Sequence, residues 1–161
     1  MSSREKIITL DSLHNWRERL RRSGGRLVVT NGCFDLLHAG HVTYLEAARA
    51  EGDVLLVGLN GDASVRQLKG PDRPLVPADD RARVLAGLAA VDAVCIFPDP
   101  RAHHFLAQAA PDVYVKGGDY TLDTLNPDER HAVEHAGGRI VFIPLLPGRS
   151  TTGLMAKILN L

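Results

Sequence analysis

The sequence predicts an α/β fold in which a doubly wound parallel sheet of five strands is covered by helices on both faces. Three observations lead to this prediction. Short apolar runs alternate with segments of helical periodicity along the chain, and no hairpin turn joins two such runs. Residues 54–59 are almost continuously apolar, which is typical of a strand buried on both faces of a parallel sheet. Right-handed crossovers between such strands give a Rossmann-like fold with the expected strand order 3-2-1-4-5.

A helix over residues 11–22 is the first expected element. Asp11 is a suitable N-cap, and Leu13, Trp16 and Leu20 share one face. We expect this face to pack on the edge of the main domain. The chain is therefore interpreted as a single domain of residues 1–161, with an N-terminal helical extension (1–24) and a Rossmann-like core (25–161).

The remaining elements alternate regularly. The five expected strands cover residues 27–29, 54–59, 93–97, 113–115 and 139–143. The intervening helices are expected over residues 41–51, after Asn60-Gly61-Asp62, and over residues 78–90, 103–110 and 126–136, with a last helix from Ser150. Residues 69–77 contain three prolines and one glycine, so they are expected to form a loop.

Composition limits the possible functions. The 161 residues are 45% hydrophobic, which suits one globular core. Lys plus Arg and Asp plus Glu number 19 each, so no basic excess predicts nucleic-acid binding. Cys33 and Cys95 lack metal or disulfide spacing and are expected to be reduced thiols in a cytoplasmic protein. No membrane span or signal peptide is predicted.

The turn that follows the first core strand carries the strongest functional signal. Residues 30–41 bring glycines, a carboxylate and two imidazoles to the carboxyl end of a strand, where open α/β sheets bind ligands. His38 and His41 stand three apart at a helix start, whose free N–H groups favour an anion, and Gly40 permits close approach. Spacing alone leaves three interpretations open: a phosphate site, a pair of surface histidines, or a zinc pair with Asp35 as a further ligand.

Four segments together carry a resemblance to a known family. They are residues 30–41, residues 69–71, residues 116–120 and residues 147–152. The pattern Gly32-x-Phe34-Asp35-x-x-His38-x-Gly40-His41 resembles the nucleotidyltransferase superfamily marked by a His-x-Gly-His motif. In combination, the segments resemble heptose 1-phosphate adenylyltransferases, which occur alone or as the C-terminal domain of bifunctional ADP-heptose synthases. The chain is too short for a sugar-kinase domain, so it is similar to the stand-alone form.

The resemblance implies a specific reaction. AMP would pass from ATP to D-glycero-D-manno-heptose 1-phosphate, giving ADP-heptose and pyrophosphate for lipopolysaccharide or related glycans. A sugar phosphate has a second pKa near ~6, so it is already largely ionised and needs no general base. Positioning and charge neutralisation then remain as the catalytic tasks. Two alternatives stay open: a cytidylyltransferase for a polyol or amino-alcohol phosphate, and a non-catalytic nucleotide-binding module. A redox dinucleotide domain is disfavoured, since no G-x-G-x-x-G follows the first core strand.

Roles for individual residues follow from the resemblance. Direct catalytic roles are expected for His38, His41, Lys69 and Arg81. Nucleotide contacts are expected from Gly32, Cys33, Phe34, Gly40, Lys116, Gly118, Asp119, Gly148, Arg149, Ser150, Thr151 and Thr152. Contacts to the sugar phosphate are expected from Thr30, Asn31, Asp35, Asn60 and Arg73.

Ordinary structural roles compete with several of these expectations. Lys69 is also interpretable as a solvated surface charge, and Arg81 as a helix charge paired with Asp79 or Asp80. Ser150 or Thr151 also suits a simple N-cap, and Asp35 and Asp119 also suit Asx-type turns. The chain departs from the family pattern at residues 125–128, where members usually have a glycine.

The resemblance also bears on cofactors and partners. Mg²⁺ is expected to arrive with ATP, because the sequence offers no dedicated set of metal ligands. The expected partners are ATP, a sugar 1-phosphate and a second copy of the chain in a homodimer, with neither nucleic acid nor membrane.

Overall fold

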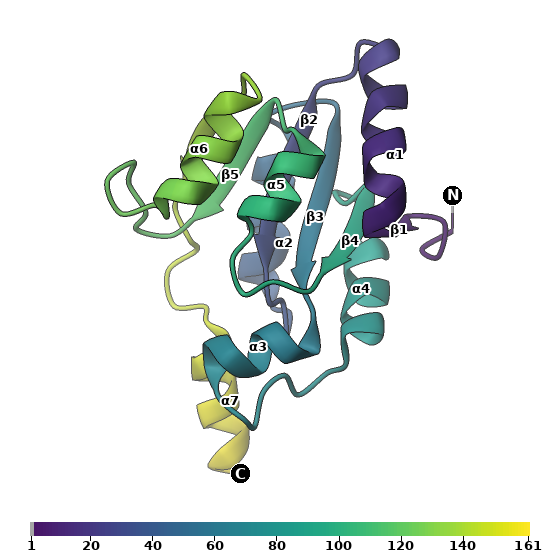
Figure 1. Ribbon diagram of the computed structural model, residues 1–161. Coiled ribbons are helices and arrows are strands. Elements are labelled where there is room, and N and C mark those ends of the chain that lie inside the picture. The colour runs from purple at the N-terminus through teal and green to yellow at the C-terminus, as the bar shows by residue number, and fades with distance from the viewer. Residues whose placement is uncertain (1) are drawn as a thin grey trace.

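Six parallel strands form the centre of the molecule, which is described for residues 2–161 by a computed structural model (Figure 1). The strands are β1 (Ile7–Ile8), β2 (Leu27–Gly32), β3 (Val54–Asn60), β4 (Ala93–Phe97), β5 (Val113–Gly117) and β6 (Arg139–Ile143). Their order in the sheet is β1-β4-β3-β2-β5-β6. The expected Rossmann-like class and the relative order of the five expected strands are therefore confirmed.

The expected number of strands is wrong by one. Ile7 and Ile8 pair in parallel with Val94 and Cys95 of β4, so the segment before the first helix extends the sheet at its edge. Lys6 reinforces this edge by donating from Nζ to the carbonyl of Val91 at 2.7 Å. Two residues are too few to show a strand period, which explains why the sequence pattern missed β1.

Seven helices are described. They are α1 (Leu10–Arg22), α2 (Ala39–Arg49), α3 (Asp62–Lys69), α4 (Ala78–Ala86), α5 (His103–Ala109), α6 (Pro127–His135) and α7 (Thr151–Leu159). The helix expected to run to residue 90 ends at Ala86 with Gly87 as its C-cap. Within residues 2–161, none of these helices has the length and apolar character needed to cross a membrane.

The first helix begins two residues earlier than expected. Thr9, rather than Asp11, is its N-cap: the Thr9 hydroxyl accepts from the backbone N–H of Ser12, and the Ser12 hydroxyl accepts from that of Thr9. This reciprocal capping box satisfies two donors at once. Leu13 of this helix is fully buried in the core.

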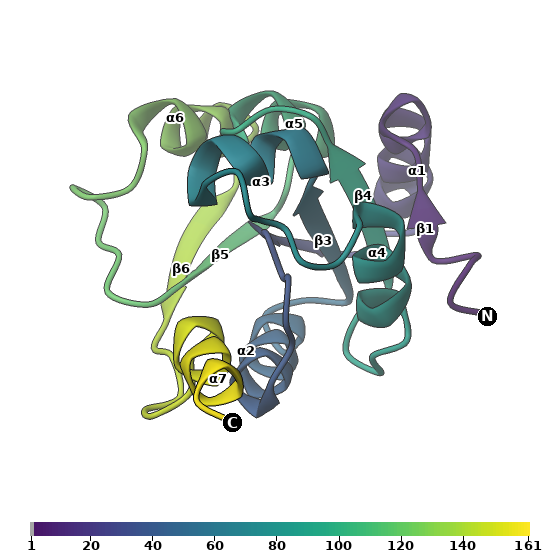
Figure 2. The ribbon, with the colours of Figure 1, turned by 90° about the horizontal axis from the view of Figure 1, so that it is seen from below.

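The two faces of the sheet carry separate apolar cores. Leu55, Val57 and Leu59 of β3 point into one core, and Leu56 points into the other. Figure 2 shows α2, α4 and α7 on one side of the sheet and α1, α5 and α6 on the other. Because both faces of β3 are covered, its continuous apolar run is explained.

Candidate active site

A cavity of about 960 Å³ opens at the carboxyl edge of the sheet. Its floor contains the ends of three neighbouring strands: Asn31 and Gly32 of β2, Asn60 of β3, and Lys116 of β5. The crevice lies where β2 meets β3 on one side and β5 on the other, the place at which doubly wound sheets bind ligands. The fold thus brings segments far apart in the sequence to one site.

His38 and His41 are fixed at the amino end of α2 by the backbone. His38 is the N-cap, and its Nδ1 accepts from the backbone N–H of Gly40 at 3.1 Å. Nδ1 of His41 accepts from the backbone N–H of His38 at 3.2 Å. The two rings lie 4.0 Å apart between centroids, and His41 lines the cavity. The helix starts at Ala39 rather than near His41, because His38 takes the cap position.

These backbone contacts decide which ring nitrogen of each histidine accepts a hydrogen bond. A neutral imidazole that accepts at Nδ1 must carry its proton at Nε2, where it is a hydrogen-bond donor. Burial, and then the charge of His38, lower the pKa of His41 to about 4. His41 is therefore neutral near pH 7 and offers an N–H rather than a positive charge.

The zinc interpretation finds no support in this arrangement. Both Nδ1 atoms accept backbone hydrogen bonds, and no group of three or more His, Cys, Asp or Glu side chains within residues 2–161 is arranged to hold a metal. The third proposed ligand, Asp35, has both carboxylate oxygens occupied by protein donors.

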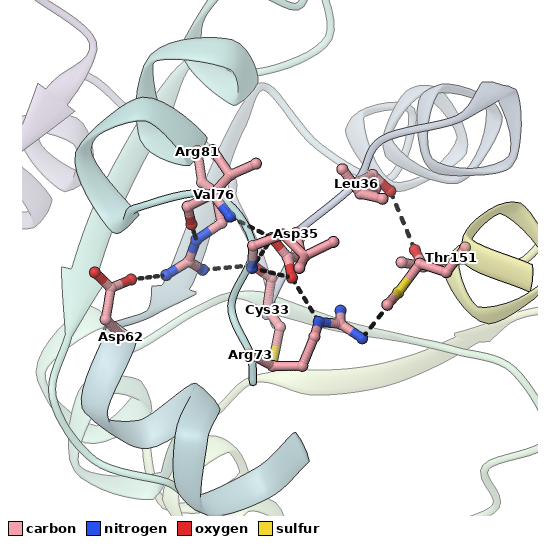
Figure 3. Close-up of polar contacts among 10 residues, drawn as sticks. Cys33, Asp35, Leu36, Asp62, Arg73, Val76, Arg81 and Thr151 are labelled. Carbon is pink, nitrogen blue, oxygen red and sulfur yellow. Dashed lines mark hydrogen bonds and ion pairs between the residues drawn. The ribbon is translucent and has the colours of Figure 1, made fainter. Parts of the chain in front are cut away.

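Asp35 fastens the proline-rich loop 70–77 to the strand-end turn (Figure 3). Its carboxylate accepts from the backbone N–H groups of Leu75 and Val76 and from Nε of Arg73 at 2.7 Å. Burial raises the pKa of Asp35, but these three donors outweigh burial and hold it below its ordinary value. The side chain is fully buried and ionised, so it acts on the loop rather than as an open carboxylate.

Arg81 contacts the same end of this loop, at Val76 (Figure 3). Its guanidinium donates to the carbonyls of Val76 and Cys33 and pairs with Asp62 at 2.7 Å. The residue is 1% exposed, and its ion-pair partner is Asp62 rather than Asp79 or Asp80. Each guanidinium nitrogen already has a protein partner, so Arg81 stands behind the cavity wall.

Helix α7 reaches the cavity from the α2 side of the sheet. The Thr151 hydroxyl donates to the carbonyl of Leu36 at 3.1 Å, and Arg73 of the loop contacts the sulfur of Met155 (Figure 3). Ser150 is the N-cap of α7, since its hydroxyl accepts from the backbone N–H of Gly153. The start of α7 is therefore tied to both the turn and the loop.

Gly40 is required by the protein itself. A Cβ at this position would lie 2.9 Å from the His38 ring and 3.2 Å from Cβ of Arg149. Its missing side chain lets the His38 ring and the start of α7 come together, and its expected contact with the nucleotide stays a prediction.

The wall opposite α7 contains a buried polar network. The Tyr114 hydroxyl donates to Oδ1 of Asn31 at 2.6 Å and lies 3.2 Å from Oε2 of Glu129. Nζ of Lys116 lies 3.6 Å from the same Glu129 oxygen and over the rings of Tyr114 and Tyr120. Asn31, Lys116, Tyr120 and Glu129 all line the cavity.

The expected site residues divide into three groups. Those that line the cavity are Asn31, Gly32, Cys33, Phe34, Asp35, His41, Asn60, Lys69, Arg73, Lys116, Thr151 and Thr152. Those that support its walls or lie beside His41 are Thr30, His38, Gly40 and Arg81. The others lie outside its lining, and of these Asp119, Gly148, Arg149 and Ser150 are exposed while Gly118 is half-buried.

Sequence reasoning missed several residues of the cavity. Tyr44 lies under it, donating to the carbonyl of Val115 and contacting the Thr30 hydroxyl at 2.7 Å. The sequence feature that could have identified Tyr44 is its position three residues after His41, which places its hydroxyl on the buried face of α2. Glu129 resembled an ordinary acidic residue in the first turn of a helix. Residues 123–127, which include part of the departure from the family pattern, also line the cavity.

Comparison with known proteins places this geometry in a family. The model of the cytidylyltransferase-like family matches residues 29–151. The bifunctional protein HldE of Methylobacillus flagellatus is 49% identical over 154 residues, which are 96% of this chain and 31% of that protein. HldE of Syntrophotalea carbinolica is 48% identical over 155 residues, with the same coverage of 96% and 31%. The chain thus spans about a third of the length of these curated relatives.

Solved structures show the same fold. A lipopolysaccharide core biosynthesis protein from Thermoplasma volcanium has a TM-score of 0.62 at 23% identity, covering 76% of this chain and 98% of that chain. A pantoate-beta-alanine ligase from Francisella tularensis has a TM-score of 0.58 at 17% identity, covering 96% and 72%. The matched family model includes the whole turn from Thr30 to His41 and extends to Thr151. The chain therefore belongs to the cytidylyltransferase-like family of nucleotidyltransferases.

Proposed function

We propose that this protein transfers AMP from ATP to D-glycero-D-manno-heptose 1-phosphate and releases pyrophosphate. The observation that carries the proposal is the neutral His41, fixed as an Nε2–H donor in a cavity that Lys69, Arg73 and Lys116 also line. The choice of substrate rests on the four motif segments and on the similarity to HldE over 96% of the chain.

In this proposal the cavity would catalyse the transfer with hydrogen-bond donors rather than with a general base. The phosphate of the acceptor is already ionised, so it attacks the α-phosphate of ATP directly. His38 and His41 would donate hydrogen bonds to the charge that develops there, and Lys69 would add a mobile ammonium from the end of α3. Fixed N–H donors need no proton transfer during the step.

Asp35 and Arg81 have a different task in this proposal. Because their polar atoms are occupied by the loop 70–77 and by Asp62, both residues position the loop rather than contact the reacting groups. The loop carries Arg73, which is thereby held at the cavity.

The nucleotide is proposed to lie along α2 and α7. The turn at Gly32, Cys33 and Phe34 lines the cavity beside His41, and Thr151 and Thr152 supply hydroxyls at the start of α7 for the β- and γ-phosphates. Gly118, Asp119, Gly148 and Arg149 are proposed to contact adenosine, and Thr30 supports the floor through Tyr44.

Mg²⁺ is proposed to enter with the nucleotide. The donors beside His41 are mainly N–H and O–H groups, which suit phosphate oxygens better than they suit a metal ion. Phosphates and water would therefore supply most of the magnesium ligands, and the ion would neutralise charge on the leaving pyrophosphate.

Pyrophosphate release tests the proposal. The protein with Mg²⁺, ATP and heptose 1-phosphate is expected to release pyrophosphate, and His41→Ala is expected to lower kcat by about 10²–10³, the usual cost of removing one transition-state donor. His131→Ala, an exposed histidine on α6, is the matched control and should keep full activity.

Two results would contradict this function. Preference for CTP over ATP would indicate a cytidylyltransferase, and a melting temperature raised by ATP without any turnover would indicate a binding module.

A homodimer is also proposed, because Ile158 and Leu159 of α7 are 53% and 82% exposed and a second copy would cover them. Sedimentation of the intact chain measures this state.

A further inference from the structure

Glu129 is a buried carboxylate in the cavity wall, paired with Lys116. It lies in the first turn of α6, and its side chain is 8% exposed. Oε1 accepts from the backbone N–H of the fully buried Ala102 at 3.1 Å. A buried carboxylate is costly unless it is paired and hydrogen-bonded, and Ala102, Tyr114 and Lys116 supply these partners.

The hydrogen-bond inventory leaves acceptor capacity on one oxygen of Glu129. Oε2 faces the Tyr114 hydroxyl at 3.2 Å, but that hydroxyl has one hydrogen and also lies 2.6 Å from Oδ1 of Asn31. The hydrogen is shared between the two acceptors, and a carboxylate oxygen has two lone pairs, so Oε2 is not saturated by this contact. Lys116 stands 3.6 Å from Oε2, which balances charge without forming a direct hydrogen bond. Oε2 therefore retains acceptor capacity at the cavity.

The charge of Glu129 selects the kind of group that can bind beside it. A carboxylate repels a phosphate but accepts strongly from neutral hydroxyls. Lys116 beside it, and the Asn31 amide joined to the same Tyr114 hydroxyl, add polar groups suited to a polyol. This wall is therefore suited to a neutral, hydroxyl-rich part of a substrate.

The geometry of in-line transfer places the acceptor on this wall. The attacking and leaving oxygens lie on opposite sides of the transferred phosphorus. If pyrophosphate leaves toward Thr151 and Thr152, the acceptor must approach from the opposite side. Figure 2 shows α6, the helix to which Glu129 belongs, across the sheet from α7 and α2, so the acceptor would approach from the side of α6.

We propose that Glu129 determines specificity for the acceptor by accepting hydrogen bonds from its sugar hydroxyls, with Tyr114 and Ala102 holding the carboxylate in place. This inference rests on the proposed function and deepens it, since it assigns the sugar half of the cavity. Asn31 and Lys116 complete the same subsite.

Equilibrium binding tests this role without requiring turnover. The dissociation constants of heptose 1-phosphate and of an ATP analogue that cannot release pyrophosphate are measured by calorimetry, the sugar phosphate in the presence of the analogue. Glu129→Gln, which keeps the shape and removes the charge, is expected to weaken sugar phosphate binding about 10-fold. Binding of the ATP analogue is expected to stay within about 2-fold of wild type, since a difference that small lies inside ordinary context effects.

Two matched variants separate recognition from folding. Glu134→Gln removes an exposed carboxylate of the same helix and should change neither constant. Tyr114→Phe removes the hydroxyl that orients Glu129 and Asn31. It should weaken the binding of the sugar phosphate but not of the ATP analogue, and by a smaller factor than Glu129→Gln does. Melting temperatures of all variants are compared with wild type to establish that each is folded.

The outcomes for Glu129 and for the proposed function are distinct. If Glu129→Gln weakens the binding of both ligands equally, or weakens the binding of neither, the proposed sugar subsite is overturned. Turnover by the wild-type protein decides the function separately: binding without transfer removes the proposed reaction, while the ratio of the two dissociation constants still decides Glu129. Failure of the wild-type protein to bind heptose 1-phosphate removes both.

Discussion

His41 shows how much a single side chain gains from its local backbone. The spacing of His38 and His41 says only that two rings share one end of a helix. The backbone N–H of His38 decides which nitrogen of His41 carries the proton, and burial decides that the ring is neutral. One residue thus becomes a fixed donor with no net charge, which suits electrostatic stabilisation of a transferred phosphoryl group.

The lowered pKa of His41 predicts a pH dependence of stability. In the unfolded chain the ring takes up a proton near its ordinary pKa of 6.5, whereas in the folded protein it does so only near about 4. The unfolded state therefore binds more protons between these values, so the contribution is complete above pH 6.5 and is lost as the pH falls toward 4. We expect the melting temperature to fall from pH 7.5 to pH 5, and to fall less in His41→Gln.

Comparing wild type with His41→Gln isolates the contribution of His41 to the pH dependence of the melting temperature. All groups other than residue 41 are the same in wild type and His41→Gln, so their contributions largely cancel when the two changes in melting temperature are subtracted. An equal decrease in melting temperature for wild type and His41→Gln would show that His41 is not the group responsible.

At the scale of elements, the loop 70–77 is held at its C-terminal end by two buried charges. Asp35 binds its backbone at Leu75 and Val76, and Arg81 binds the carbonyl of Val76 from the opposite side. A loop rich in proline has few backbone donors to satisfy, so a few contacts suffice to fix it. Charged groups, rather than apolar packing, therefore shape this wall of the cavity.

Removal of Asp35 is expected to release the loop. Asp35→Ala leaves two backbone N–H groups and the largely buried Arg73 without their acceptor, which is expected to cost about 3–5 kcal/mol of unfolding free energy. Urea denaturation measures this change. Asp72→Ala, which removes an exposed carboxylate from the same loop, is the control and should cost less than about 0.5 kcal/mol. Similar losses for both variants would contradict the role of Asp35.

At the scale of the molecule, the N-terminal segment is joined to the sheet. Strand β1 pairs with β4, Leu13 of α1 is fully buried, and Arg17 donates to the carbonyl of Ala110 and pairs with Asp112. Residues 1–24 were expected to be an extension of a core that begins at residue 25; residue 1 lies outside the described part. The contacts of residues 2–24 support the proposal that they unfold together with that core.

Truncation of Leu13 tests this cooperativity. Leu13→Ala is expected to lower the unfolding free energy by about 2–5 kcal/mol, because it removes a fully buried side chain and leaves a cavity. Urea denaturation should show one transition at a lower midpoint. His14→Ala, exposed on the same helix, is the control. If Leu13→Ala instead produces an early partial transition and the midpoint of the main transition does not change, the N-terminal segment unfolds as a separate unit.

Much of the fold was predictable because its signals are local. The continuous apolar run of β3, the caps at Asn126 and Ser150, and the prolines of the loop each act within a few residues. Elements with weak local signals were missed: β1 is two residues long, and the start of α1 depends on a reciprocal cap between Thr9 and Ser12. The expectation that Asp11 caps α1 was reasonable by residue type, but the pair formed by Thr9 and Ser12 satisfies two backbone N–H groups at once.

The sequence by itself determined the order of the strands, the edge of the sheet that carries the site, and the motif turn with its two histidines. Only the tertiary structure decided which polar groups are consumed by the protein and which stay open at the cavity. Asp35 and Arg81 proved to be occupied by protein partners, while Oε2 of Glu129 kept part of its acceptor capacity at the cavity. The reason is physical: strand order follows from local periodicity and chain handedness, whereas the free capacity of a hydrogen-bonding group depends on partners far away in the sequence.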